Sequence, residues 1–398
     1  RHASRRTPQL ETPMNILMIA SLYKPYNRGG AEVVFENLVN ELKKEHNVSI
    51  LTIAPWSGFR SLQPSMAQEN GATIYRFYPF NIFSFIHIIG KPALLRLIWH
   101  VLDMFNLHSY FVMRSVIRHV KPDVVMTHNI KGVGYTVPRA IRSTGIPHVH
   151  TLQDIQLLNP SGLVLYGEER AFKNTNILVR LYERACRRLF GSPSMVVFAS
   201  DYLRNLYREK GFFFQSSIIT IPNPLPPVFF DAPVSIKEKS TPVIFAAIGQ
   251  IDIARGSFFC VEAFKKFSRP DCELWMIGGG EEKIRSFVDG DPRIHLLGAM
   301  PNEKIGELLQ NVHYVLVPVL CYTNSPVVTF EAFARGVPAI VASIGGAAEP
   351  VKEGENGFLF EPGNERSFLN ALNEAFLCDR YTELSCAARS SIEGTSAG

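Results

Sequence analysis

Two glycine-containing turns that follow apolar runs could hold a phosphate group. In the first, Ile16–Ala20 leads through a proline-containing loop to Gly29-Gly30-Ala-Glu32, which opens an amphipathic stretch. Glycines let the backbone approach a ligand closely, and the free N–H groups of a helix N-terminus bind phosphate. An ordinary tight turn before a helix gives the same pattern, so both interpretations stay open. The turn lacks the GxGxxG fingerprint, which disfavours a dehydrogenase.

The second turn is Gly249–Gly256, which directly follows the apolar run Val243–Ile248. The guanidinium of Arg255 suits bidentate contact with phosphate oxygens, whereas Gln250 can donate a hydrogen bond but brings no charge. The glycine run that starts at Gly278 suits either a nucleotide or a plain strand-to-helix turn. Taken singly, each of these loops is also explained as a structural turn.

A carboxylate lies close to the start of a predicted helix in the C-terminal half. A loop that contains Ser325, Pro326 and Val327 precedes the predicted helix Thr329–Arg335, which stops at a glycine with a proline two residues later. We expect Glu331 in the first turn of this helix. There it would stabilise the helix dipole, or it would bind a ligand.

Short apolar runs alternate with amphipathic segments along the whole chain, which predicts an α/β protein with parallel sheets. The predicted strands are Ile16–Ala20, Val48–Ile53, Ile74–Phe77, Val124–Thr127, His148–Leu152, Met195–Ala199, Ile218–Ile221, Val243–Ile248, Glu273–Ile277, Ile294–Leu297, Tyr314–Val317, Ala339–Ala342 and Phe358–Phe360.

The proline-rich segment 221–227 is the best domain boundary, because its prolines fit neither a helix nor a central strand. We expect doubly wound domains over 14–225 and 226–377. Residues 1–13 are expected to be a leader or disordered tail. Residues 378–398 are expected to be a tail that crosses back to the N-terminal domain or is truncated. Ligands of open α/β sheets bind beyond the carboxyl ends of the strands, so two such domains would face a cleft.

Composition narrows the class of protein. The 398 residues are 46% hydrophobic and 19% charged, as in soluble globular proteins, and the net charge of +5 does not indicate nucleic acid binding. The six cysteines show no CxxC pair and no metal-ligand spacing, which predicts reduced thiols in a cytosolic protein and no metal cofactor. No stretch of 18 uncharged apolar residues would span a membrane.

Several segments in the C-terminal half resemble, in order and spacing, the retaining glycosyltransferases of family 4. They are Gly249–Gly256, Trp275–Glu282, Tyr322–Pro338, Ile344–Val351 and Glu353–Gly363. Together with Gly29–Glu32, the resemblance covers the chain from Met14 to about Leu377. It implies a GT-B fold, in which two Rossmann-like domains face a cleft. The N-terminal domain would bind the acceptor and the C-terminal domain a nucleotide sugar.

The resemblance also implies roles for particular residues. Glu331 would accept hydrogen bonds from ribose hydroxyls, while the family's second glutamate, eight positions earlier, is Thr323 here. The two cations that grip the donor diphosphate in the family correspond to Gln250 and Arg255. The implied donor site comprises Gly29, Gly30, Gly249, Gln250, Arg255, Gly256, Gly278, Ser325, Pro326, Val327 and Glu331.

In the N-terminal half, Thr151-Leu-Gln153-Asp154 resembles a Thr-Leu-His-Asp segment whose histidine lies beside the transferred sugar. Gln153 can bind a hydroxyl but carries no proton at neutral pH. His128 ends a run that resembles a family strand, and it is either a polar or basic group of the site or a packed core residue. The implied catalytic set is Gln153, Asp154, His128 and Thr323.

The activity so implied is transfer of a sugar from a nucleotide diphosphate sugar to a glycan or lipid-linked acceptor, with retention of configuration. The departing phosphate would take the acceptor's proton, so the protein would mainly stabilise charge and position both sugars. The departures at Gln153, Gln250, Arg255 and Thr323 indicate an unusual donor or a weakened enzyme. A nucleotide-sugar-binding homologue without transfer, or a nucleotide-sugar epimerase, are the alternatives. We expect a cytoplasmic location, including the inner face of the membrane.

Two basic amphipathic stretches bear on that location. In 92–107, apolar residues recur at helical spacing beside Lys91, Arg96 and His100, and in Ile177–Phe190 arginines recur on one helical face. Such helices suit the interface of an anionic membrane. Core packing of the apolar faces with solvated arginines explains them equally well. The apolar residues are Leu94, Ile98, Val101, Leu102 and Phe105, and the arginines are Arg180, Arg184 and Arg187.

Overall fold

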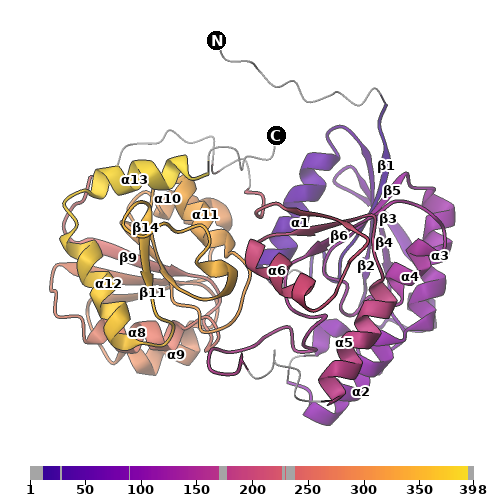
Figure 1. The fold of residues 1–398 in the computed structure, drawn as a ribbon, viewed down its shortest axis with the longest axis horizontal. Coiled ribbons are helices and arrows are strands. Elements are labelled where there is room, and N and C mark those ends of the chain that lie inside the picture. The colour runs from indigo at the N-terminus through magenta and orange to yellow at the C-terminus, as the bar shows by residue number, and fades with distance from the viewer. Residues whose placement is uncertain are drawn as a thin grey trace. The chain divides into compact units, whose positions relative to one another are not determined.

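The computed structural model describes residues 12–26, 29–88, 90–169, 177–225, 229 and 238–392. The chain divides into two compact units, each with its own sheet of mainly parallel strands (Figure 1). Unit 1 comprises residues 1–153, 184–197 and 211–219, and unit 2 comprises 154–183, 198–210 and 220–398. Of the expected leader, residues 1–11 lie outside the described part.

The sheet of unit 1 has the order β3-β4-β2-β1-β5-β6-β7-β8. Pairings among β1, β2, β4, β5 and β6 are parallel, and β3 pairs with β4 in the antiparallel direction. The strands are β1 (Asn15–Ile19), β2 (Asn47–Ile53), β3 (Ser65–Glu69), β4 (Ala72–Phe77), β5 (Val124–Thr127), β6 (His148–Leu152), β7 (Met195–Phe198) and β8 (Ser217–Thr220). The sequence did not predict β3, because all five of its side chains are exposed and polar residues predominate.

Helices cover both faces of this sheet. Phe35 and Val39 pack against Ile16 and Met18, while the alternate strand residue Leu17 is also fully buried. This burial of successive strand residues explains the continuous apolar run. The helices of unit 1 are α1 (Gly30–Leu42), α2 (Ala93–Met104), α3 (Leu107–Val120) and α4 (Val137–Arg142), with short 3₁₀ helices η1 (Phe59–Leu62) and η2 (Phe85–His87). Helix α5 (Ile177–Phe190) is divided between the units at Arg184, and α6 (Asp201–Glu209) belongs to unit 2.

The sheet of unit 2 has the order β11-β10-β9-β12-β13-β14 and is parallel throughout. Its strands are β9 (Val243–Ile248), β10 (Cys272–Ile277), β11 (Ile294–Gly298), β12 (Tyr314–Val317), β13 (Ala339–Ala342) and β14 (Gly357–Phe360). The helices are α8 (Ser257–Lys265), α9 (Glu281–Val288), α10 (Asn302–Leu308), α11 (Val327–Ala334), α12 (Glu365–Leu377) and α13 (Tyr381–Ser390), with η4 (Gly345–Ala347) as a 3₁₀ helix. Because β9 lies between β10 and β12, the order of winding reverses there.

The placement of Glu331 corrects one expectation. Helix α11 begins at Val327, two residues earlier than predicted, because Pro326 forms the N-cap and its carbonyl accepts from the Thr329 N–H. Glu331 is therefore the fifth residue of the helix and not part of its first turn. A dipole interaction at the N-terminus falls off within the first turn, so it does not explain this carboxylate.

The described part of the expected C-terminal tail belongs to unit 2. Helix α13 packs on α11, and the Tyr381 hydroxyl donates to the His313 carbonyl at 3.0 Å. Ser385 donates through its hydroxyl to the Gly336 carbonyl, which closes the end of α11. Residues 393–398 lie outside the described part.

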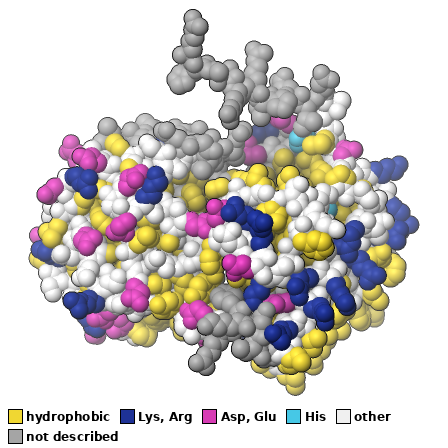
Figure 2. Space-filling model, in the orientation of Figure 1, with side chains coloured by type: hydrophobic (Ala, Val, Ile, Leu, Met, Phe, Trp, Pro, Cys, Tyr) yellow, Lys and Arg dark blue, Asp and Glu magenta, His cyan; other side chains and the backbone are white. Residues whose placement is uncertain are grey.

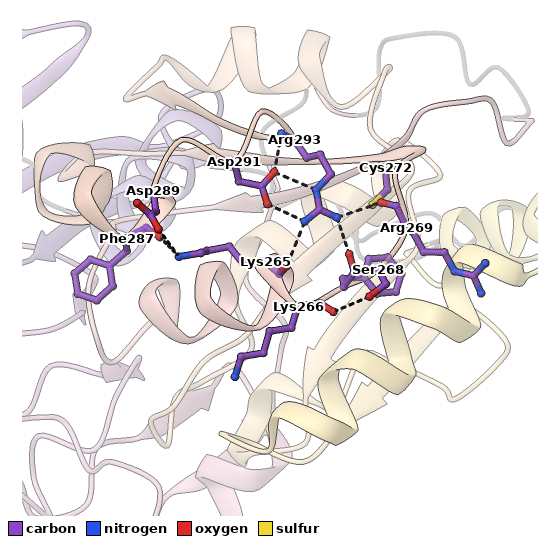
Figure 3. Close-up of polar contacts among 10 residues, drawn as sticks. Lys265, Lys266, Ser268, Arg269, Cys272, Phe287, Asp289, Asp291 and Arg293 are labelled. Carbon is purple, nitrogen blue, oxygen red and sulfur yellow. Dashed lines mark hydrogen bonds and ion pairs between the residues drawn. The ribbon is translucent and has the colours of Figure 1, made fainter.

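A polar cluster around Arg293 ties the loops at the amino-terminal edge of this sheet (Figure 3). The guanidinium donates from Nε and Nη2 to the Asp291 carboxylate at 3.0 and 2.7 Å. Its Nη1 donates to the carbonyls of Phe267 and Arg269. These bonds hold the pKa of Asp291 below its usual value, chiefly through the side-chain hydrogen bond from Arg293. All three guanidinium nitrogens of Arg293 donate hydrogen bonds to protein acceptors, so we infer that the cluster is structural.

Candidate active site

Three loops of unit 2 converge at the carboxyl ends of β9, β10 and β12. A Cβ atom on Gly278 would lie 1.8 Å from the Gly249 carbonyl oxygen, and one on Gly256 would lie 1.7 Å from that of Pro318. Both glycines also have positive φ angles, of 148° and 71°. Only glycine fits either position, so these residues fix the approach of the loops. This edge is the switch point of the sheet, where α/β proteins bind ligands.

Arg255 lies in the loop that leads from β9 to α8. Its backbone N–H donates to the Asp252 carboxylate at 2.7 Å, while its side chain is exposed and makes no ion pair with any described residue. The Ser257 N–H, the first of α8, donates to the Asp252 carbonyl at 3.3 Å. Gly256 caps the helix without a side-chain acceptor, so the N–H groups of Phe258 and Phe259 stay available. Gln250 is also exposed. The arrangement offers a cation and a helix N-terminus to an anion.

Glu331 is buried at the same end of the sheet, with only 7% of its surface exposed. Burial raises the pKa of its carboxyl to about 7. Within the described residues no donor hydrogen-bonds this carboxyl. A buried carboxylate without a donor is costly, and a ligand hydroxyl would relieve that cost.

The segment before α11 is fixed to η4. The Ser325 hydroxyl donates to the Gly346 carbonyl at 2.9 Å, and the Gly346 N–H donates to the Thr323 carbonyl at 2.9 Å. Thr323 therefore positions the loop through its backbone, and its side chain is partly exposed. Pro326 and Val327 follow as the cap and first residue of α11. The predicted donor residues of unit 2 thus lie along one edge of its sheet.

Unit 1 has its own small hollow, of about 10 Å³, at the carboxyl ends of β1, β5 and β6. It is lined by Ala20, Ser21, Leu22, Ala31, Glu32, Phe35, His128, Asn129 and Gln153. The structure therefore brings together His128, Gln153 and the turn at the start of α1, three features that are far apart in the sequence. Because β1 lies between β2 and β5, this edge is also a switch point.

His128 is held neutral in this hollow. It is 3% exposed, packs edge-on against Phe35 at 5.0 Å between ring centroids, and neither ring nitrogen has a partner among the described residues. Burial lowers the pKa of the imidazole to about 4. His128 is thus suited to exchange hydrogen bonds with a ligand and poorly suited to act as a base at neutral pH.

The turn at Gly29 differs from the expected phosphate site. The Gly29 N–H donates to the Glu32 carboxylate at 2.8 Å, so the start of α1 already has an acceptor. The negative charge of Glu32 disfavours phosphate beside Gly30, whereas neutral hydroxyls fit. Glu32 was not among the predicted site residues, although an acid three positions after a helix cap is a known signal.

Asp154 is not part of the hollow. It belongs to unit 2, and its carboxylate accepts from the backbone and side-chain nitrogens of Gln156 at 2.8 and 2.6 Å. This pairing gives Asp154 a role in its own turn. Asn129 and Ser21 also line the hollow and were not among the predicted site residues, although Asn129 directly follows His128 in the strand end that resembles the family.

The described residues hold neither a metal-binding cluster nor a membrane-spanning helix. They contain no group of three or more histidine, cysteine, aspartate or glutamate side chains that could hold a metal ion. No helix in the described ranges is long and apolar enough to cross a membrane. All six cysteines are free thiols.

Comparison with known proteins agrees with this geometry. Residues 28–228 match the family described as Glycosyltransferase Family 4, and residues 242–377 match Glycosyl transferases group 1. An uncharacterised 42.6 kDa protein in the cps region of Klebsiella pneumoniae is 25% identical over 343 residues, covering 84% of this chain and 87% of that protein. An uncharacterised glycosyltransferase of Methanocaldococcus jannaschii is 22% identical over 375 residues, covering 89% of this chain and 87% of that protein.

Solved structures show the same fold. Sucrose-phosphate synthase from Thermosynechococcus elongatus superposes with a TM-score of 0.72 at 15% identity, over 96% of this chain and 94% of that one. Anabaena HepE in complex with UDP-glucose gives a TM-score of 0.66 at 16% identity, with 96% of each chain covered. The fold is thus that of the GT-B glycosyltransferases. The chain belongs to glycosyltransferase family 4, in the group 1 glycosyl transferases.

Proposed function

We propose that this glycosyltransferase binds a nucleotide diphosphate sugar at unit 2 and transfers the sugar with retention of configuration. The observation that carries the proposal is the unpaired carboxyl of Glu331, buried at the edge where Arg255 and the start of α8 offer positive charge. A nucleotide diphosphate presents hydroxyls and phosphates, which match these two groups. The titles of Anabaena HepE structures name UDP and UDP-glucose, which supports this donor class by analogy.

The proposed reaction needs no enzyme base. The bond between the anomeric carbon and the diphosphate oxygen breaks as the acceptor oxygen bonds to that carbon on the same face. The acceptor's proton passes to the departing phosphate oxygen. Arg255 and the N–H groups of α8 would stabilise the charge that develops on the diphosphate. On this route the neutral state of His128 and the presence of Gln153 do not prevent transfer.

The acceptor proposed for unit 1 is a glycan or a lipid-linked sugar, at the inner face of the membrane in the cytoplasm. The hollow around His128 and Gln153 offers neutral hydrogen-bonding groups, and Glu32 adds an acceptor for hydroxyls. Carbohydrate hydroxyls suit such a set. Since the positive groups of unit 2 can neutralise the diphosphate, no metal cofactor is proposed.

A second candidate is a homologue that binds the nucleotide sugar but transfers slowly. The exposed Gln250 favours it, because its amide brings no charge to the loop that holds Arg255. The same protein would then show donor binding without turnover in the presence of acceptors.

A panel of UDP, GDP and ADP sugars in a thermal-shift assay tests the binding step. We expect at least one to raise the midpoint of unfolding, because a ligand of the native state stabilises it. Transfer is then measured with the best donor and a mixture of glycan and lipid-linked acceptors, and NMR of the product gives its anomeric configuration. Inversion, or no stabilisation by any nucleotide sugar, would contradict the proposal.

A further inference from the structure

Helix α2 and the start of α3 expose an apolar surface that the site does not use. We call it the α2–α3 face; it consists of Leu94, Leu97, Ile98, Val101, Phe105 and Leu107. Exposed fractions range from 43% for Ile98 to 67% for Leu94. Of the two interpretations of this stretch, core packing is wrong for Leu94, Ile98, Val101 and Phe105. Scattered single apolar residues need no explanation, but a contiguous set on one helix does.

The exposure does not come from a loosely held helix. On the inner side of α2, Trp99 is 1% exposed, its indole N–H donates to the Phe83 carbonyl at 2.8 Å, and its ring stacks on Phe83 and Phe85. One turn later the buried carboxyl of Asp103 accepts from the Gly132 N–H at 2.9 Å. The inner face is thus fixed to unit 1, while the outer face has no apolar partner among the described residues.

The segment that contains this face carries exposed charge of one sign. Residues 79–122 contain a single acid, Asp103, which is 2% exposed, against five lysines and arginines. The five are Lys91, Arg96, Arg114, Arg118 and Lys121. Figure 2 shows dark-blue and yellow side chains intermixed over the part of unit 1 where Figure 1 places α2 and α3.

We propose that the α2–α3 face inserts into the headgroup region of an anionic lipid surface. An apolar helix face flanked by lysine and arginine is the composition that binds such interfaces. A second copy of the chain fits less well, because a two-fold contact would set the same cations against each other. Among the described residues, no exposed acid of 79–122 would compensate them.

The position of this face relates it to the acceptor. The loop that follows β5 carries His128 at its start and Gly132 at the contact with α2. Both the face and the hollow belong to unit 1. The lipid surface that binds the α2–α3 face would therefore also hold the lipid part of a lipid-linked acceptor. This last step rests on the proposed function; lipid binding itself does not.

The test is co-flotation of the full chain with vesicles of phosphatidylcholine, with and without phosphatidylglycerol, in the absence of any sugar. The variant Leu94→Glu/Leu97→Glu removes two exposed apolar groups. Phe214→Glu is the matched control, since Phe214 is 80% exposed in unit 1 and lies outside residues 79–122. A third variant, Arg96→Glu, reverses one charge and leaves the exposed apolar groups in place.

We expect binding to the anionic vesicles, weakened by salt, and none to the neutral ones. The double variant should lose at least about tenfold in partition, and Arg96→Glu several-fold, while Phe214→Glu binds like the parent. Circular dichroism and nucleotide binding should be unchanged in all three, which separates this proposal from the donor site. Equal losses in Phe214→Glu, no vesicle binding by the parent, or conversion of a dimeric parent to a monomer by the double variant would each overturn the proposal.

Discussion

The two edges of the unit 2 sheet use polar side chains in opposite ways. At the amino-terminal edge, Arg293 is bonded to a carboxylate and to backbone carbonyls. At the carboxyl edge, the carboxyl of Glu331 is buried without a donor among the described residues and Arg255 is exposed without an ion pair. Polar groups with hydrogen-bond partners stabilise a fold, whereas buried polar groups without partners are candidates for ligand binding. From this difference we infer a structural role for one edge and propose ligand binding at the other.

Replacing Arg293 by methionine should have the largest effect, and it should act on stability. The substitution leaves the Asp291 carboxylate and the carbonyls of Phe267 and Arg269 without their donor. Because Arg293 and Asp291 are four-fifths or more buried, we expect a loss of about 2–3 kcal/mol in the free energy of unfolding. Urea denaturation measures it.

The matched control for this variant is Lys266→Met, which breaks an exposed pair with Glu365 in the same unit. It should change the free energy of unfolding by less than about 0.5 kcal/mol, as exposed ion pairs do. Nucleotide affinity of folded Arg293→Met should equal that of the parent. A loss of nucleotide binding in folded Arg293→Met would show that the amino-terminal edge also takes part in binding, which contradicts the contrast between the two edges.

Replacing Glu331 by glutamine should act on binding instead. Hydrogen bonds to a charged acceptor contribute about 2 kcal/mol, so the affinity for a nucleotide sugar should fall roughly 30-fold. Stability should not fall, because the variant removes an unpaired buried acid. Isothermal titration and urea denaturation give the two values. A less stable variant with parental affinity would show that Glu331 is structural.

The affinity of the parent should depend on pH because of the same carboxyl. Burial puts the pKa of free Glu331 at about 7, and hydroxyl donors favour its charged form, so binding lowers this pKa and releases a proton. Affinity should be full above pH 7 and fall by up to about tenfold per unit as the pH drops below 7. A nucleotide sugar is the right probe, because its diphosphate does not titrate in this range. In Glu331→Gln the affinity should no longer depend on pH in this range. An equally steep fall in the affinity of this variant would show that another group causes the pH dependence.

Replacing Arg255 by methionine should have the smallest effect of the set. An exposed cation beside a phosphate is screened by solvent, so we expect a loss of about 1 kcal/mol in binding free energy. Raising the salt concentration should weaken the parent more than the variant. The control is Arg285→Met, an exposed arginine of α9 that should leave binding unchanged. Equal losses in both variants would indicate a non-specific charge effect.

Much of this architecture could be predicted from the sequence, and the failures have physical causes. Every predicted strand forms, because buried parallel strands require apolar runs such as Val243–Ile248. The exposed edge strand β3 has no such run. The start of α11 was placed two residues late because Pro326 caps the helix, and this moved Glu331 out of the first turn.

The site was predicted in outline only. The glycines at 256 and 278 lie at close loop contacts, and both belong to turns that the sequence marked. The hydrogen bond from the Gly29 N–H to Glu32 depends on a side-chain conformation. The neutral state of His128 depends on its burial by segments that are distant in the sequence. Neither follows from spacing along the chain. The exposure of the α2–α3 face was likewise undecided, since a helical apolar pattern is the same for core and for a surface.

Amide hydrogen exchange of the full chain, with and without its best nucleotide sugar, tests the central claim most directly. The account predicts that the ligand protects 249–258 and 323–331, the segments that hold Arg255 and Glu331. Protection confined to 21–32, at the turn before α1, with no change in unit 2 would contradict it.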